Sequence, residues 1–212
     1  MASTVPRIVF DTSAFLDLFG RWTEDHKERQ GDLVKEVHIL APLKPFLFST
    51  RQILREVHES MVIGTDLERC LPFETVSDAE LTACPGFVNV READFSLTAL
   101  TRRFEIEGFR TFLITKDRTC AQDLAKAGLK TNVVPPTGFA DAITVLTPEG
   151  SPLVALAHRI QNNTYVNLSR GMLLARKTRG EREYLDWQAF LNFRTASRYE
   201  LVWALKATGV TL

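Results

Sequence analysis

The fold is decided first at residues 7–19, Arg7-Ile-Val-Phe-Asp-Thr-Ser-Ala-Phe-Leu-Asp-Leu-Phe19. Residues 7–10 form a short β-branched and aromatic run, which is typical of a buried strand. A polar Asp-Thr-Ser step follows, and residues 14–19 then have the apolar spacing of a helix that ends before Gly20. The stretch therefore predicts a strand that ends in an acid, Asp11, and leads directly into a helix.

The pattern of a strand followed by a helix recurs along the chain. Residues 46–48, 111–115 and 132–134 are further short apolar runs, and the second of them is followed by another acid, Asp117. Helical spacing or capping residues mark the segments around them, at residues 53–64, 77–84, 93–104, 118–127, 152–161, 181–193 and 197–209. This alternation favours an α/β fold with a mainly parallel central sheet flanked by helices.

Local signals refine some of these segments. Ser49 with Gln52 has capping-box spacing before the second helix, and Thr50 is the alternative cap. Pro42 and Pro45 predict a turn. Two segments have no clear period: residues 21–37, which predict an exposed helix or a loop, and residues 165–177, which are ambiguous between strand and helix.

Composition bounds the class of protein. The chain has 212 residues, of which 45% are hydrophobic and 25% charged, so it predicts one globular domain, or one domain with an appendage. No apolar stretch approaches the roughly 18 residues of a membrane helix. The start lacks the apolar stretch and cleavage site of a secretory signal, so we expect a cytosolic protein.

Several kinds of site are excluded by the residue types present. The three cysteines, Cys70, Cys84 and Cys120, are an odd number without C-x-x-C pairing, which predicts reduced thiols. The four histidines are scattered, so no histidine metal set or nucleophilic triad emerges. Glycine-rich phosphate-binding patterns are also absent.

Charge is distributed unevenly although the chain is neutral as a whole. Residues 151–212 hold nine Lys and Arg against four Asp and Glu, a net charge of +5 that leaves −5 for residues 1–150. Five of the basic residues lie close together between Tyr165 and Tyr184: Arg170, Arg176, Lys177, Arg179 and Arg182. This cluster predicts either a nucleic-acid-binding surface, with rings for base stacking, or an ordinary solvated helix face.

Four acids stand where an α/β sheet forms its sites. Asp11 and Asp117 follow strands, and ligands bind at the carboxyl ends of strands in open sheets. Glu56 and Asp94 lie early in helices, and we expect them to join the same cleft. Four converging carboxylates stay ionised only if cations neutralise them, and oxygen ligands select Mg²⁺ or Mn²⁺ over zinc.

Each acid also has an ordinary explanation. An Asp at the start of a helix can cap the helix or interact favourably with the dipole at its N-terminus, which would explain Asp11, Asp94 and Asp117. Glu56 would be explained as an acid on the solvated surface of a helix. Glu59, one turn from Glu56, is an alternative to it. Asp123 reaches the cleft only if its helix leans inward.

These motifs together resemble the PIN-domain nucleases. Residues 9–16, Val-Phe-Asp-Thr-Ser-Ala-Phe-Leu, are similar to the opening of that family, and residues 53–57 to the helix that carries its second acid. Residues 93–100, followed by the Thr115-Lys-Asp117 step, resemble its third acid and its strand ending in Thr-x-Asp. The likeness covers about residues 5–136, and residues 137–212 form a mostly helical basic extension.

The resemblance implies a three-layer PIN-like fold and an Mg²⁺- or Mn²⁺-dependent endoribonuclease in which metal-activated water attacks phosphorus. It implies that Asp11, Asp94 and Asp117 are metal ligands and that Glu56 is a ligand or a base-like positioner. Ser13 and Thr115 would orient the acids by hydrogen bonding. The implied partners are RNA and an inhibitory antitoxin-like protein, and the extension would serve an accessory role, dimerisation or nucleic-acid binding.

Two rival hypotheses stay open. The first is a catalytically weak or inactive PIN-like module that binds RNA or a protein through the basic extension. The second is a different α/β enzyme that uses Asp11 as a phosphoacceptor, which requires a second acid such as Asp17. The C-terminal helix, residues 197–209, is either packed on the body, in contact with a second subunit or used as a recognition helix.

Overall fold

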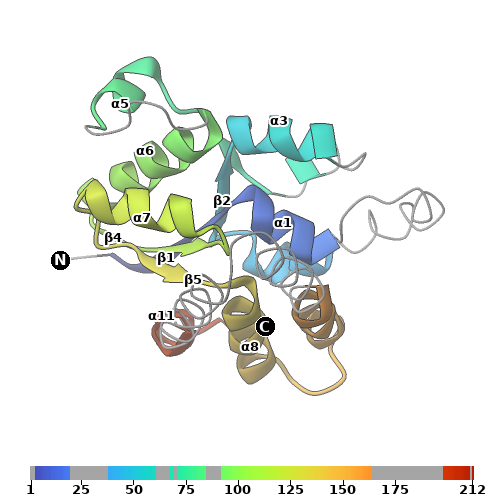
Figure 1. Ribbon diagram of the computed structural model, residues 1–212. Helices are drawn as coiled ribbons and strands as arrows, with labels where there is room; N and C mark the ends of the chain where they lie inside the picture. The colour runs from blue at the N-terminus through green and yellow to red at the C-terminus, as the bar shows by residue number, and fades with distance from the viewer. Residues whose placement is uncertain are drawn as a thin grey trace, which may run out of the picture.

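The chain folds into a parallel sheet with helices on both sides (Figure 1). The computed structural model describes residues 3–19, 38–60, 67–68, 71–84, 92–163, 198–210 and 212. The strands are β1 (Ser3–Phe10), β2 (Leu47–Thr50), β3 (Phe73–Glu74), β4 (Phe109–Ile114) and β5 (Asn132–Val134). The helices are α1 (Thr12–Phe19), η2 (His38–Leu43, a 3-10 helix), α3 (Arg51–Ser60), α5 (Asp78–Thr82), α6 (Glu92–Ile106), α7 (Arg118–Lys126), α8 (Pro136–Leu146) and α11 (Arg198–Ala207), and residues 152–163 are also helical.

The strand order determines where the loops meet. The sheet has the order β3-β2-β1-β4-β5, and each neighbouring pair is parallel. The chain leaves β1 through α1 toward β2, and it returns to the other side of β1 when it forms β4. The carboxyl ends of β1 and β4 are therefore adjacent at a topological switch point, which is where open α/β sheets bind ligands. The predicted α/β class with a parallel sheet is confirmed.

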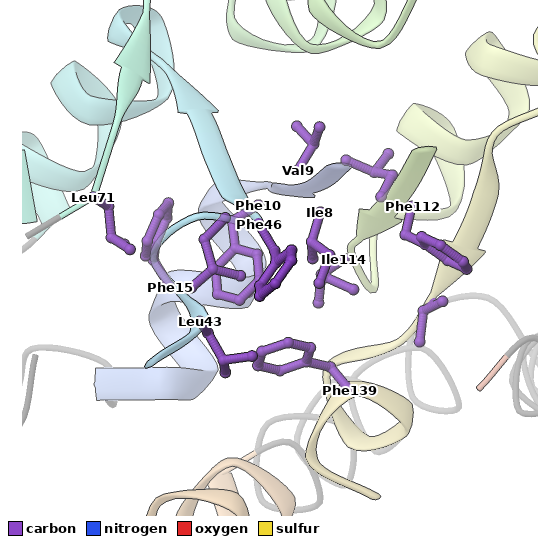
Figure 2. Close-up of a cluster of buried hydrophobic side chains, with 14 of the residues drawn as sticks. Ile8, Val9, Phe10, Phe15, Leu43, Phe46, Leu71, Phe112, Ile114 and Phe139 are labelled. Atoms are coloured by element: carbon purple, nitrogen blue, oxygen red, sulfur yellow. The ribbon is translucent and has the colours of Figure 1, made fainter. Parts of the chain in front are cut away.

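The core lies on both faces of the central strands. Residues 8–10 of β1 and residues 112–114 of β4 are all buried, as expected for parallel strands covered by helices. Figure 1 shows α6 and α7 on one side of the sheet and α8 and α11 on the other. Phe10 makes edge-on contacts with Phe15 of α1 and Phe139 of α8, with ring centroids 5.4 and 5.0 Å apart (Figure 2). The core thus includes residues beyond position 136.

Two helix starts, those of α3 and α5, have a predicted capping residue, although at α3 it is the second of the two candidates. The capping box of Ser77 and Glu80 is formed at the start of α5. The box proposed for Ser49 is wrong, because the Ile53 backbone N–H donates to Thr50 Oγ1 at 3.2 Å, which makes Thr50 the cap of α3. The Ser49 hydroxyl instead donates to the Phe10 carbonyl oxygen at 2.7 Å and ties β2 to the end of β1.

Three of the elements given above, β3, α8 and η2, are absent from the predicted set. β3 has only two residues, too few for a periodic pattern. α8 starts at Pro136, where a run of two prolines and a glycine indicates a loop, although proline is also well suited to the first turn of a helix. Pro42, predicted to lie in a turn, is inside η2.

Other predictions fall on residues that the structure does not describe. They concern the segments 21–37, 165–177 and 181–193 and the thiol of Cys70. Cys84 and Cys120 are buried free thiols, as predicted. Among the described helices, none combines the length and the apolar composition that crossing a bilayer requires.

Candidate active site

Asp11 is the centre of the polar cluster at the carboxyl edge of the sheet. It follows β1 directly, and its side chain is only 5% exposed. Its Oδ2 accepts hydrogen bonds from the Ser13 hydroxyl at 2.7 Å and from the Thr115 hydroxyl at 2.5 Å. These two donors come from the segments that follow β1 and β4, so the carboxylate is held from both sides of the switch point.

The two hydroxyls are themselves oriented by the chain after β4. Ser13 Oγ accepts from the backbone N–H of Lys116 at 3.1 Å, and Thr115 Oγ1 accepts from the backbone N–H of Asp117 at 2.9 Å. Each hydroxyl therefore accepts one bond and donates one to Asp11. This relay fixes the side chains of Ser13 and Thr115 in the hydrogen-bonding roles predicted for them.

The environment of Asp11 disfavours its charge. Burial raises the pKa of the Asp11 carboxyl, the hydrogen bonds from Thr115 and Ser13 lower it, and the negative charge of Asp117 raises it again. The net pKa lies above the ordinary value, because removal from water is the largest of these effects. A cation bound between Asp11 and Asp117 would remove both the repulsion and much of the cost of desolvation.

Glu56 lies in the second turn of α3, beside the start of α1. Its Oε2 accepts a hydrogen bond from the Thr12 hydroxyl at 2.6 Å, and Thr12 is the residue after Asp11. Glu59, the alternative to Glu56, is exposed to solvent. The structure thus connects Glu56, rather than Glu59, to the segment that carries Asp11.

Asp94 lies in the first turn of α6, which starts at the same edge of the sheet. The buried hydroxyls of Thr50 and Ser96 are 2.6 Å apart and join the end of β2 to this turn. Asp94 is half-buried, and its backbone carbonyl accepts a hydrogen bond from Thr98. Its place at the edge agrees with the predicted site.

The four predicted acids do not form a ready-made cage. In the described part of the chain, no group of three or more His, Cys, Asp or Glu side chains is arranged to hold a metal ion. The pair that the structure brings together is Asp11 and Asp117, whose charges interact. The roles of Glu56 and Asp94 as metal ligands stay predictions.

Asp17, the second acid that the phosphoacceptor hypothesis requires, is paired with Lys116. Its side chain is fully buried in an ion pair with the ammonium group of Lys116. Its backbone carbonyl accepts a hydrogen bond from Asn163, at 2.8 Å. Asp17 therefore joins α1 to the loop between Thr115 and Asp117 and to the helix over residues 152–163, and it neutralises the charge of Lys116.

Gln52 is a candidate site residue that the sequence analysis did not identify. It was predicted only as a member of the Ser49 capping box, which is not formed. Its Oε1 is buried and has no hydrogen-bond partner. Gln52 lies one turn before Glu56 on the same face of α3, closer to the carboxyl edge. A buried acceptor without a donor is unfavourable unless a ligand or water satisfies it.

The donor chemistry at this edge fits a hard divalent cation. The candidate ligands are the oxygens of Asp11 and Asp117, with the unpartnered oxygen of Gln52 on the neighbouring helix. Mg²⁺ is commonly held by one or two carboxylates together with water and substrate phosphate, so a pair of acids is sufficient. The residues present thus fit Mg²⁺ or Mn²⁺ better than zinc, which prefers nitrogen and sulfur ligands.

Two sets of predicted residues are not placed by the structure. The basic cluster formed by Arg170, Arg176, Lys177, Arg179 and Arg182 lies outside the described residues, and for Asp123 only the backbone in α7 is described. No protein-family model, curated protein or solved structure matches the chain. The case for a function therefore rests on the sequence motifs and on the geometry at the carboxyl edge.

Proposed function

We propose that this protein is a PIN-like, Mg²⁺- or Mn²⁺-dependent endoribonuclease. The observation that carries the proposal is the placement of Asp11: a buried carboxylate at the topological switch point, held by hydroxyls from both flanking segments and adjacent to Asp117. A carboxylate kept in such a costly environment needs a compensating partner, and the donor set favours a hard cation.

Asp11 and Asp117 would hold the cation. When bound, the metal supplies Lewis acidity: it lowers the pKa of water and neutralises charge that develops on the phosphate. Ser13 and Thr115 keep the Asp11 carboxylate in one orientation through their hydrogen bonds to Oδ2. Their contribution is preorganisation, because the carboxylate does not have to be positioned again in each turnover.

Glu56 and Asp94 would act from the neighbouring helices. Glu56 is held through Thr12 and would position the attacking water or complete the metal site once substrate phosphate is present. Asp94 would contribute from the first turn of α6. RNA cleavage by attack of water on phosphorus then leaves the protein unchanged and needs no covalent intermediate with Asp11.

The test is hydrolysis of labelled single-stranded RNA with Mn²⁺, with Mg²⁺ and with EDTA. We expect cleavage with either metal, none with EDTA, and none by the Asp11→Asn variant. Glu149→Gln is the matched control, since Glu149 is an exposed acid after α8, and this variant should cleave at the parental rate. Cleavage by Asp11→Asn at the parental rate would overturn the proposal.

A second candidate function is favoured by one observation. Because the described residues contain no group of three acids arranged for a metal, a PIN-like module that binds RNA or a protein partner without cleaving it is the alternative. Titrations with metal and with RNA distinguish the two functions. If the protein binds RNA but does not bind Mg²⁺ or Mn²⁺ at millimolar concentration, the binding module is favoured.

A further inference from the structure

Lys116 is held to α1 at two points. Ser13 and Asp17 are four residues apart in α1, so they lie one turn apart on the same face of the helix. The backbone N–H of Lys116 donates to Ser13 Oγ at 3.1 Å, and the Lys116 ammonium group forms an ion pair with Asp17. One face of α1 therefore fixes both the backbone and the side chain of Lys116.

The chain that follows β4 depends on side chains for its hydrogen bonds. β4 ends at Ile114, and the backbone N–H of Thr115 still donates to a neighbouring strand, to the Val134 carbonyl oxygen at 3.1 Å. The next two backbone N–H groups, those of Lys116 and Asp117, donate to side-chain hydroxyls instead. The hydrogen bonds of the sheet therefore end just before Asp117.

Asp117 needs this local support because its side chain is exposed to solvent. Packing in the core does not hold it, in contrast to Asp11, which is buried at the end of β1. The two carboxylates are proposed to share a cation, so the backbone over residues 115–117 decides whether Asp117 lies within reach of that cation. When groups that orient metal ligands in this way are removed, metal affinity commonly falls by about 10- to 100-fold.

Helix α1 is a rigid support for the ion pair. Phe15 and Leu18, which precede and follow Asp17 in the helix, are buried in the core. The backbone carbonyl oxygen of Asp17 also accepts a hydrogen bond from the Asn163 side chain at 2.8 Å, which ties this turn of α1 to the helix over residues 152–163. The ion pair therefore connects Lys116 to a fixed part of the fold.

The pair is not explained by stability alone. The Asp17 side chain is 0% exposed and the Lys116 side chain 15%. Removing both charges from water costs free energy that their attraction does not always recover, and apolar pairs of similar volume often stabilise a protein as well or better. An ion pair differs from an apolar pair because it holds the two groups in one geometry. Holding the loop over residues 115–117 in one geometry is a role that needs these charges.

We propose that Asp17 is a positioning residue for the proposed metal site. Its ion pair with Lys116 holds the loop over residues 115–117 against α1, and Asp117 is thereby kept beside Asp11. This inference rests on the proposed function, because it names what keeps a proposed metal ligand in place. Asp17 itself contacts neither the metal nor the RNA.

The experiment replaces the ion pair with an apolar pair in the full chain, Asp17→Leu together with Lys116→Met. A single replacement would leave one buried charge without its partner and destabilise the fold, whereas the double replacement removes both charges. Thermal unfolding of this apolar pair variant should stay close to that of the parent. Calorimetric titration should show its Mn²⁺ affinity reduced by about 10- to 100-fold.

Amide hydrogen exchange, measured by NMR on the metal-free protein, tests the position of the loop itself. The backbone N–H groups of Lys116 and Asp117 should exchange faster in the apolar pair variant, because their bonds to the two hydroxyls are formed less often. The N–H groups within β4 should exchange as in the parent. The control variant, Arg110→Gln with Glu200→Gln, removes another ion pair of β4 and should change neither the exchange of the loop nor the Mn²⁺ affinity.

Three results would each overturn the inference. The first is an Mn²⁺ affinity of the apolar pair variant equal to that of the parent, and the second is unchanged exchange of the two loop N–H groups. The third is faster exchange throughout β4 as well, which would show that the pair stabilises the fold as a whole. A parent that binds no Mn²⁺ would overturn the proposed function instead, and hydrogen exchange on the metal-free protein would still decide whether Asp17 holds the loop.

Discussion

The segment from Arg7, in the middle of β1, to Asp11, which follows the strand, has a charged side chain at each end, and the two are held in opposite ways. Asp11, at the carboxyl end, is surrounded by hydroxyl donors and by a second acid. Arg7, at the amino end of this segment, is surrounded by aromatic rings, with its guanidinium carbon 4.1 Å from the Phe109 centroid and 4.5 Å from that of Phe48. The first arrangement surrounds a carboxylate with polar groups, and the second surrounds a guanidinium with aromatic rings, where its buried Nε has no hydrogen-bond partner among the described residues.

The pKa shifts follow the same difference. Burial lowers the pKa of Arg7, and the negative charges of Glu107 and Glu74 partly restore it. At Asp11 the neighbouring charge, Asp117, has the same sign and adds to the effect of burial. The neighbouring charges therefore favour the charged form of Arg7, whereas the charge of Asp117 disfavours the charged form of Asp11. If the proposed function holds, substitutions at the Asp11 end should affect cleavage and substitutions at the Arg7 end should affect stability.

The largest effect is expected from breaking the hydroxyl relay at the carboxyl end. Thr115→Val removes the donor to Asp11 and the acceptor for the Asp117 N–H, so we expect RNA cleavage to fall by about 10- to 100-fold. Steady-state kinetics should show the loss mainly in kcat. Thr111→Val, on the same strand but away from the site, is the control, and an equal loss in that variant would mean that the effect is only structural.

At the amino end, the expected effect is on stability alone. Arg7→Ala removes the contacts of the guanidinium with the rings, and we expect the free energy of unfolding to fall by about 1–2 kcal/mol while cleavage is unchanged. Denaturant titration measures the first and the RNA assay the second. Arg110→Ala, at an exposed position, should change stability less. A loss of cleavage in Arg7→Ala would contradict the division between the two ends.

The pH dependence of stability should differ between the two ends. Because the pKa of Asp11 is raised in the folded state, the folded protein binds a proton more tightly than the unfolded chain does. The stability contribution of Asp11 therefore falls as pH rises from the ordinary Asp pKa to the raised one, and it is constant above that.

Unfolding titrations across this acidic range should show Asp11→Asn gaining stability relative to the parent as pH rises. The metal-free protein is required, since a bound cation would oppose the effect. Arg7→Ala should show no change of this kind relative to the parent. If the difference in the free energy of unfolding between the parent and Asp11→Asn does not depend on pH, the raised pKa of Asp11 is contradicted.

The smallest effect is expected at Gln52, whose buried oxygen has no partner. Gln52→Leu removes the unsatisfied acceptor, and we expect the free energy of unfolding of the metal-free protein to rise by up to about 1 kcal/mol. Cleavage should fall at the same time if the oxygen faces the substrate. Lower stability in the variant would show that the oxygen is satisfied in solution, and an unchanged cleavage rate would remove Gln52 from the site.

Part of this architecture is readable from local sequence. The bounds of β5, Asn132–Val134, were predicted without error, because a pair of valines with strong β propensity is followed directly by two prolines. The capping box at Ser77 is likewise a local device. Asp11 and Asp117 were identified as strand-end acids, and parallel strands place such residues at one edge.

Other features depend on contacts that local patterns do not contain. The ion pair of Asp17 and Lys116 joins residues 99 positions apart, and the Thr50–Ser96 contact joins two helix starts across the sheet edge. The capping box at Ser49 is not formed because of another such long-range contact: the Ser49 hydroxyl donates to the carbonyl oxygen of Phe10 on β1. The unpartnered oxygen of Gln52 is a property of its surroundings, so no pattern in the sequence indicates it.

The most direct test of the central claim is calorimetric titration of the protein with Mn²⁺ at neutral pH. Asp11 and Asp117 are proposed to hold one cation together, so the parent should show a binding site that is lost in Asp11→Asn and in Asp117→Asn but kept in Glu149→Gln. Equal Mn²⁺ binding by the parent and by Asp11→Asn would contradict the account.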